Sequence, residues 1–223
     1  MTNAVDWRIA SSLLRNINRL PRETPVALLL RHSVREDLPP GDAGNRLPIT
    51  ETGEKLAITL GQTLGTRLKT LRSSPLIRCV QTAEALREGA GVSEDVTTDR
   101  LLGDPGIYVL DSQRAWSNWE SLGHKVVMKH LVSDDAALPG MARPDEAARL
   151  LVQHMFVVAR NTPGLHVFVT HDSLITATVA RFQGRYLEEG DWPLYLEGAC
   201  FWRSNNGIHT AYRNSECVRE NST

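Results

Sequence analysis

The 223-residue chain is predicted to adopt an α/β fold, with a mostly parallel central sheet and helices on both faces in a three-layer sandwich. Two continuous apolar runs predict the sheet. "PVALLLRH" (25–32) and "GLHVFVTHD" (164–172) are typical of strands that are buried on both faces. Amphipathic segments of helical period alternate with these runs, which is the order that parallel βαβ units require.

Local signals predict the remaining elements in chain order. Thr50 is a suitable N-cap for the helix after the first strand, and the helix after the next strand is expected to stop at Gly89. Pro144 suits the first turn of a later helix. Asn205 and Gly207 flank the tip of a C-terminal hairpin. The expected elements are a helix at 11–20, a loop at 39–48, a helix at 49–68, strands at 70–74 and 96–98, a turn at 103–106, and helices at 76–89, 112–123, 143–161 and 173–184.

The length of the chain predicts a single domain over residues 1–223. No linker of Pro, Gly and Ser divides the sequence convincingly. Residues 90–143 are less regular than the rest, and we expect them to form a cap insertion on the domain.

Charge and hydropathy exclude several classes of protein. Lys and Arg total 25 against 26 Asp and Glu, so the chain offers no general attraction to nucleic acid or to an acidic membrane surface. No apolar stretch approaches the roughly 18 to 20 residues of a membrane span, and the first residues do not resemble a signal peptide. A cytoplasmic protein is expected. The three cysteines are far apart and show no metal-ligand spacing.

Charged residues gather where the predicted strands give way to helices. Arg31 and His32 end the first apolar run, His171 and Asp172 end the second, and Arg78 lies in the first turn of a helix that follows a short strand. The carboxyl ends of strands in open α/β sheets are where ligands bind. Helix N-termini there present free N–H groups and a positive dipole end. The sequence therefore predicts an anion pocket.

The residue types in this pocket suit phosphate. The planar forks of Arg31, Arg35 and Arg78 can each donate two hydrogen bonds to phosphate oxygens. Surrounding positive charge should lower the pKa of His32 and keep one ring nitrogen unprotonated near neutral pH. That nitrogen could attack a phosphoryl group, and the same charges would stabilise the group during its transfer.

Three motifs in this order resemble the histidine phosphatase superfamily: "RHSVR" (31–35), "SSPLIRCVQTAEAL" (73–86) and "VTHDSLI" (169–175). The resemblance implies a phosphoglycerate mutase-like fold and phosphoryl transfer without a metal or an organic cofactor. It implies that His32 becomes phosphohistidine. It also implies that Arg31, Arg78 and His171 hold the phosphate oxygens.

The motifs are more similar to those of the acid phosphatase and phytase branch of the superfamily. Arg35 stands where that branch carries a further phosphate arginine, and Asp172 stands where its His-Asp pair supplies the proton donor. In the mutase branch the donor is a glutamate after the second arginine motif, where Asp104 is the nearest carboxylate here. We favour Asp172 and expect burial and the approaching phosphate to raise its pKa. Ser33 replaces the usual glycine and either narrows the phosphate site or donates a hydroxyl to it.

These observations favour a phosphatase that hydrolyses a small-molecule phosphomonoester. A mutase-like transferase and a non-catalytic module that binds phosphorylated ligands are the alternatives. The individual residues also have simpler interpretations: Asp172 as a helix N-cap, Asp104 as a turn residue and Arg35 as a solvated loop side chain. The sequence identifies neither the substrate nor the oligomeric state.

Overall fold

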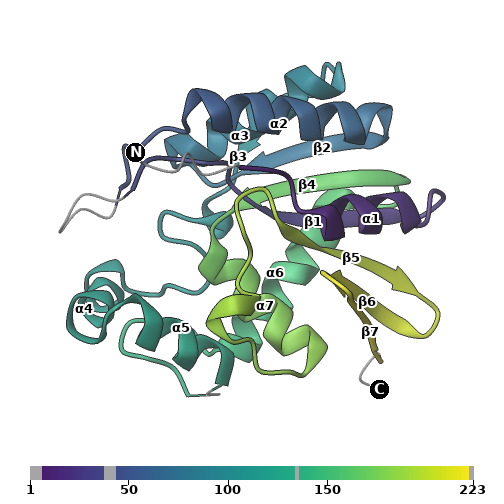
Figure 1. The fold of residues 1–223 in the computed structure, drawn as a ribbon. Coiled ribbons are helices and arrows are strands. Elements are labelled where there is room, and N and C mark those ends of the chain that lie inside the picture. Colours follow the sequence, from purple (N-terminus) through teal and green to yellow (C-terminus); the bar gives the residue numbers. More distant parts are fainter. Residues whose placement is uncertain (1–6, 38–43, 134–135, 221–223) are drawn as a thin grey trace.

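A seven-stranded mixed sheet forms the centre of the protein (Figure 1). The computed structural model describes residues 7–37, 44–133 and 136–220; the first part of the loop predicted at 39–48, residues 39–43, lies outside this range. The strand order is β3-β2-β4-β1-β5-β6-β7. The strands are β1 Pro25–Arg31, β2 Leu68–Ser73, β3 Val96–Thr98, β4 Gly164–Thr170, β5 Gly198–Ser204, β6 Gly207–Tyr212 and β7 Ser215–Arg219.

The predicted α/β class is confirmed, and the sheet has two halves of different strand direction. The pairings from β3 through β2 and β4 to β1 are parallel. The pairings from β1 through β5 and β6 to β7 are antiparallel, and the predicted C-terminal hairpin is β5 and β6. Strand β7, which was not predicted, extends this hairpin at the edge of the sheet.

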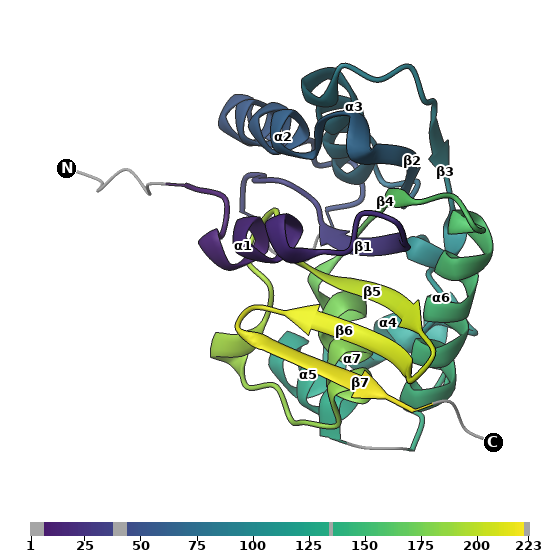
Figure 2. The same ribbon diagram turned by 90° about the vertical axis from the view of Figure 1, so that its right-hand side faces the viewer.

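Helices cover both faces of the sheet (Figure 2). The helices are α1 Ser11–Arg19, α2 Glu51–Leu64, α3 Ile77–Ala90, α4 Ser112–Leu122, α5 His124–Ser133, α6 Pro144–Ala159 and α7 Asp172–Gln183, with short 3-10 turns η1 Gly65–Arg67, η2 Arg100–Leu102 and η3 Glu189–Asp191. Helices α1 to α3 pack on one face and α5 to α7 on the other. Among the described residues, no helix is both long and apolar enough to cross a membrane.

The central strand β1 is buried on both faces, as its continuous apolar run predicts. Val26, Leu28 and Leu30 belong to the core under α1, α2 and α3, whereas Ala27 and Leu29 belong to the core under α5, α6 and α7. This alternation is the two-residue period of a strand. All five side chains are fully buried, which holds the end of β1 in a fixed position relative to its neighbours.

Helix α3 does not stop at Gly89, so that prediction is wrong. The helix continues to Ala90 and ends at Gly91, whose φ of 64° gives the left-handed cap. Gly89 instead permits close packing of α3 on α2, because a Cβ atom there would lie 1.9 Å from the carbonyl oxygen of Ile58.

Candidate active site

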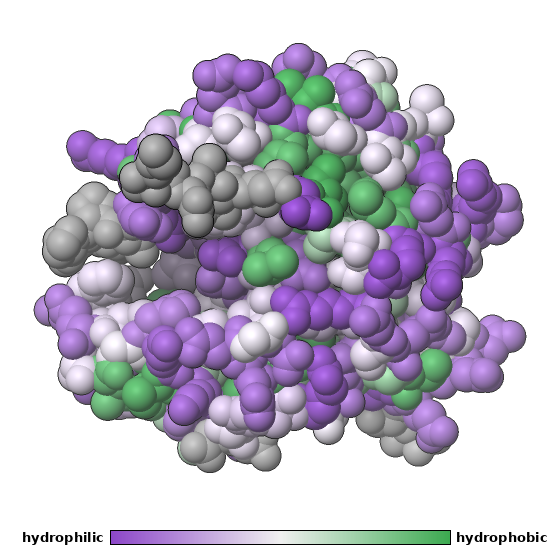
Figure 3. Space-filling view, viewed as in Figure 1, coloured by the Kyte–Doolittle hydropathy of each residue, from purple (hydrophilic) through white to green (hydrophobic). Residues whose placement is uncertain are grey.

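The sheet topology brings the two histidine motifs together. Strands β1 and β4 are parallel neighbours and pair Arg31 with Thr170, so His32 and His171 follow at the same edge. The backbone N–H of His32 donates to the Thr170 carbonyl at 3.0 Å. This edge is on the left in Figure 1, and Figure 3, from the same side, shows the surface hollowed at its left.

His32 is held as a neutral imidazole with one unprotonated ring nitrogen. Its Nδ1 lies 2.8 Å from the Ser33 carbonyl oxygen. Because a carbonyl can only accept, Nδ1 carries the proton and Nε2 carries a lone pair. Burial lowers the pKa of His32 well below its usual value, and the neighbouring His171, Arg31 and Arg78 lower it further. The ring is 3% exposed, and Nε2 accepts a hydrogen bond from Nε of Arg78 at 3.2 Å.

Arg78 stands between the two histidines. Its Nη1 donates to the Gly44 carbonyl at 2.6 Å, and its Nη2 lies 3.4 Å from Nδ1 of His171. The His32 and His171 rings are 5.6 Å apart between centroids. Burial, followed by the charge of Arg78, lowers the pKa of His171. Both histidines are therefore neutral beside a buried guanidinium.

The loop after η2 supports His171 from the other side. Nε2 of His171 lies 3.2 Å from the Ser74 hydroxyl. A Cβ atom at Gly103 would lie 2.7 Å from that Nε2 and 2.4 Å from the Ser74 oxygen, and the φ of Gly103 is +155°. Glycine is needed here both for its backbone conformation and for the close approach. The segment that contains Asp104 thus begins in contact with the site.

Two further arginines have donors that no described protein group accepts. Nε of Arg31 and Nε of Arg35 are buried and have no hydrogen-bond partner among the described residues. The other Arg31 nitrogens bind Asp172 Oδ2 at 2.9 Å and the Pro193 carbonyl at 2.7 Å. Arg35 Nη1 donates to the Glu36 carbonyl at 2.6 Å. Because buried donors are rarely left unpaired, two such N–H groups indicate a site for an anion.

Asp172 is the first residue of α7, and in the free protein its pKa is lowered, whereas the expected rise was for the site with phosphate bound. Burial alone would raise the pKa. The charge of Arg31, the interactions with His124 and His171, and a hydrogen bond from the Ser173 backbone N–H together outweigh burial. In this arrangement Asp172 is an ionised partner of Arg31.

The carboxylate of Asp104 is exposed, on the turn that follows Gly103. The Asp104 backbone has a φ of 56°, and its carbonyl accepts a hydrogen bond from Nε of Arg100 at 3.0 Å. The turn thus has a structural role. Asp104 is exposed, whereas Asp172 is paired with Arg31.

The structure places the Ser33 side chain away from the phosphate site. Its hydroxyl donates to the Gly53 carbonyl in α2 at 2.6 Å, and its backbone N–H donates to the Thr82 hydroxyl in α3 at 2.9 Å. Ser33 is fully buried. It therefore connects the His32 loop to two helices, and neither expected role at the phosphate describes its side chain.

One aromatic residue beside His32 was missed by the sequence interpretation. The Tyr195 ring lies 5.6 Å from the His32 ring, and the Arg31 guanidinium lies 4.3 Å from the Tyr195 ring centroid. Tyr195 belongs to the segment between η3 and β5, which passes over the end of β1. Nothing in the run "DWPLYLEG" marks this tyrosine, because its position depends on how β5 pairs with β1.

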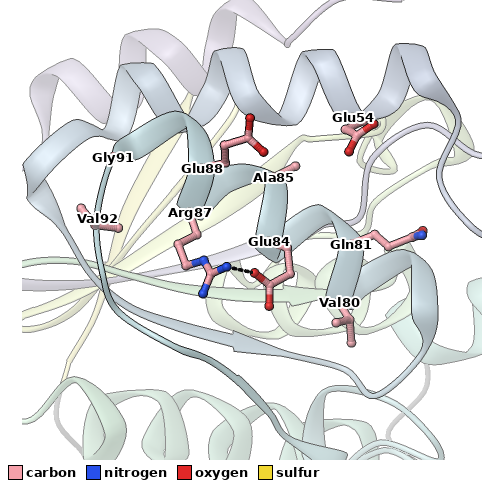
Figure 4. A pocket seen from close by; sticks show the side chains of 9 residues that line it. All are labelled: Glu54, Val80, Gln81, Glu84, Ala85, Arg87, Glu88, Gly91 and Val92. Atoms are coloured by element: carbon pink, nitrogen blue, oxygen red, sulfur yellow. Dashed lines mark ion pairs between the residues drawn. The ribbon is translucent and has the colours of Figure 1, made fainter.

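A hollow of about 480 Å³ between α2 and α3 is a different surface feature (Figure 4). Three carboxylates line it, those of Glu54, Glu84 and Glu88, and the one arginine there, Arg87, is paired with Glu84 at 2.7 Å. This surface would repel an anion. The histidines of the predicted phosphate site, His32 and His171, lie instead at the ends of β1 and β4.

These observations define an α/β protein with a cluster of arginines around a neutral histidine at the carboxyl edge of its parallel strands. A family model for the histidine phosphatase superfamily (branch 1) matches residues 28–201. The chain belongs to this superfamily, as the three motifs predicted. The match is to branch 1. It is not to the acid phosphatase branch, which the positions of Arg35 and Asp172 had favoured.

Solved structures with the same fold include phosphatases and a mutase. Entamoeba histolytica phosphoserine phosphatase, in a structure with phosphoserine, is 15% identical, with a TM-score of 0.59 over 85% of this chain and 96% of that chain. Mycobacterial glucosyl-3-phosphoglycerate phosphatase is 21% identical, with a TM-score of 0.51 over 86% and 100%. Bacillus anthracis phosphoglycerate mutase is 12% identical, with a TM-score of 0.51 over 89% and 94%. At these identities the likeness establishes the fold. A search of curated proteins found no match.

Proposed function

We propose that the protein is a phosphomonoester hydrolase that works through phosphohistidine on His32. The observation that carries the proposal is the hydrogen bond from Nδ1 to the Ser33 carbonyl, because it leaves Nε2 unprotonated. Nε2 accepts a hydrogen bond from Nε of Arg78, and attack on phosphorus requires that Arg78 donate to the phosphate instead. The unpaired N–H groups of Arg31 and Arg35 supply further donors for the phosphate oxygens.

The reaction has two balanced steps. In the first, Nε2 of His32 forms a bond to phosphorus, the bond from phosphorus to the ester oxygen breaks, and the leaving oxygen takes a proton from a carboxylic acid. In the second, water attacks phosphorus, the bond to Nε2 breaks, and the carboxylate takes a proton from the water. Inorganic phosphate and the alcohol are the products.

We propose Asp172 as the proton donor, because its carboxylate already contacts the arginine that would hold the phosphate. A bound phosphate dianion would compete for the N–H groups of Arg31. Losing that cation and gaining a nearby anion both raise the pKa of a carboxyl group. The branch 1 match favours the alternative, Asp104, by its position after the second arginine motif.

Rapid quenching with a labile phosphomonoester tests the proposal. We expect an alkali-stable, acid-labile phosphoryl adduct on residue 32, followed by release of inorganic phosphate, and neither in the His32→Ala variant. An adduct that passes to an acceptor alcohol without phosphate release would indicate a mutase. Ligand binding with no adduct and no release would indicate a binding module and contradict the proposal.

A further inference from the structure

Two aromatic rings lie in sequence of contact from His32: the Tyr195 ring contacts His32, and the Trp7 ring contacts Tyr195. Tyr195 is half-buried, with its ring tilted 49° to that of His32. The Trp7 ring meets the Tyr195 ring edge-on, at 5.4 Å between centroids and 71° between planes. Trp7 is 40% exposed and the neighbouring Leu194 is 58% exposed. A partly exposed aromatic pair therefore lies next to the cationic side chain of Arg31.

An ion pair between Arg213 and the buried Glu197 holds the chain segment that carries Tyr195. Arg213 donates to both carboxylate oxygens of Glu197, at 3.1 and 3.0 Å, and to the carbonyls of Gly190 and Trp192, at 2.6 and 2.7 Å. The backbone N–H of Leu194 donates to the same carboxylate at 2.9 Å. Glu197 is 2% exposed. These contacts hold the backbone on both sides of Tyr195, and a segment that is ordered before the ligand binds loses less entropy on binding.

We propose that Tyr195, with Trp7 against its ring, is a specificity-determining residue and that the substrates are phosphomonoesters whose leaving group carries an aromatic ring. This inference rests on the proposed function. Arg31 contacts the Tyr195 ring with its guanidinium, so a phosphate bound by Arg31 would lie close to that ring. An aromatic leaving group can then stack on Tyr195 or meet its edge.

The charge around the mouth supports an uncharged leaving group. In the free protein Asp172 is ionised next to Arg31, so it would repel a second acidic group on a substrate that approaches the site. Lys125, at the start of α5, is already paired with Glu189 at 2.8 Å. An aromatic leaving group without a carboxylate is not repelled by Asp172. It also does not require the ion pair between Lys125 and Glu189 to break.

Benzyl phosphate and ethyl phosphate separate ring recognition from leaving-group chemistry, because both release alkyl alcohols. We expect the wild-type kcat/KM to be at least 10-fold higher for benzyl phosphate. Tyr195→Ala should lower the benzyl-to-ethyl ratio by about 5- to 150-fold, the range for loss of one aromatic stacking contact. Tyr195→Phe should retain the ratio. Because Tyr195 also packs on Arg31, part of the loss is common to both esters, and the ratio removes that part.

A binding measurement and a control variant complete the test. Titration with benzylphosphonate and methylphosphonate should show the same preference without turnover, and thermal unfolding should show that each variant is folded. Tyr186→Ala, an exposed tyrosine elsewhere, should leave both rates unchanged. An equal loss for both esters in Tyr195→Ala, or no wild-type preference while phosphohistidine still forms, would overturn this inference alone. Absence of the adduct and of hydrolysis would remove the proposed function and this inference with it.

Discussion

Replacing Arg78 by Met tests whether the guanidinium between the two histidines is part of the chemistry. Its Nε and Nη2 atoms point at His32 and His171, the space that the transferred phosphoryl group would enter. A hydrogen bond to a charged group contributes about 1.5–3 kcal/mol. Losing two such bonds costs about 3–6 kcal/mol, which corresponds to a fall in kcat/KM of about 10²- to 10⁴-fold.

The same substitution should change the protonation of His32. The positive charge of Arg78 contributes to the lowered pKa of His32, so its removal should raise that pKa. The acid limb of the pH–rate profile should move to higher pH, and NMR titration of the ring should show the same shift. A loss of rate without this shift would mean that Arg78 acts only by binding the ester.

Arg87→Met is the matched control. Arg87 lies on the same helix but faces outwards, where it pairs with Glu84. We expect this variant to keep kcat/KM within about twofold of wild type. If Arg78→Met is folded and retains kcat/KM within threefold, or if both variants lose activity equally, the assignment of Arg78 to the phosphate site is wrong.

Three other outcomes follow from the structure. Asp172→Asn should lower kcat/KM by about 10²- to 10⁴-fold for benzyl phosphate and much less for 4-nitrophenyl phosphate, whose leaving group needs no proton; a larger selective loss in Asp104→Asn would transfer the role to Asp104. Urea unfolding should show that the free energy of unfolding falls as the pH drops below about 6.5, by up to about 2.7 kcal/mol per pH unit. The reason is that the unfolded chain protonates His32 and His171, whereas the folded protein keeps them neutral. A flat profile would contradict the two lowered pKa values. Gly53→Ala should destabilise the protein by about 1–3 kcal/mol in the same assay, because its Cβ would lie 2.4 Å from a backbone oxygen of the segment after β1; unchanged stability would show that this contact can relax.

The sequence determined those features that local backbone chemistry controls. The apolar run before Arg31 marks a strand buried on both faces, Thr50 caps α2 through its hydroxyl as its position predicts, and the Asn-Gly signal marks the β5–β6 turn. Parallel strands present their carboxyl ends at one edge, so the motifs around His32 and His171 could be expected to meet. The apolar periodicity of the strands and the order of strands and helices were therefore enough to predict that these two motifs lie together.

Tertiary structure decided which partner each side chain has. The sequence cannot show that Arg31 pairs with Asp172 and lowers its pKa, or that the Ser33 hydroxyl turns to Gly53, because these contacts join segments that fold next to each other from distant positions. The same holds for Tyr195, whose place beside His32 depends on the pairing of β5 with β1. Electrostatic and hydrogen-bond energies depend on distance and direction in space, whereas spacing along the chain specifies only the local backbone.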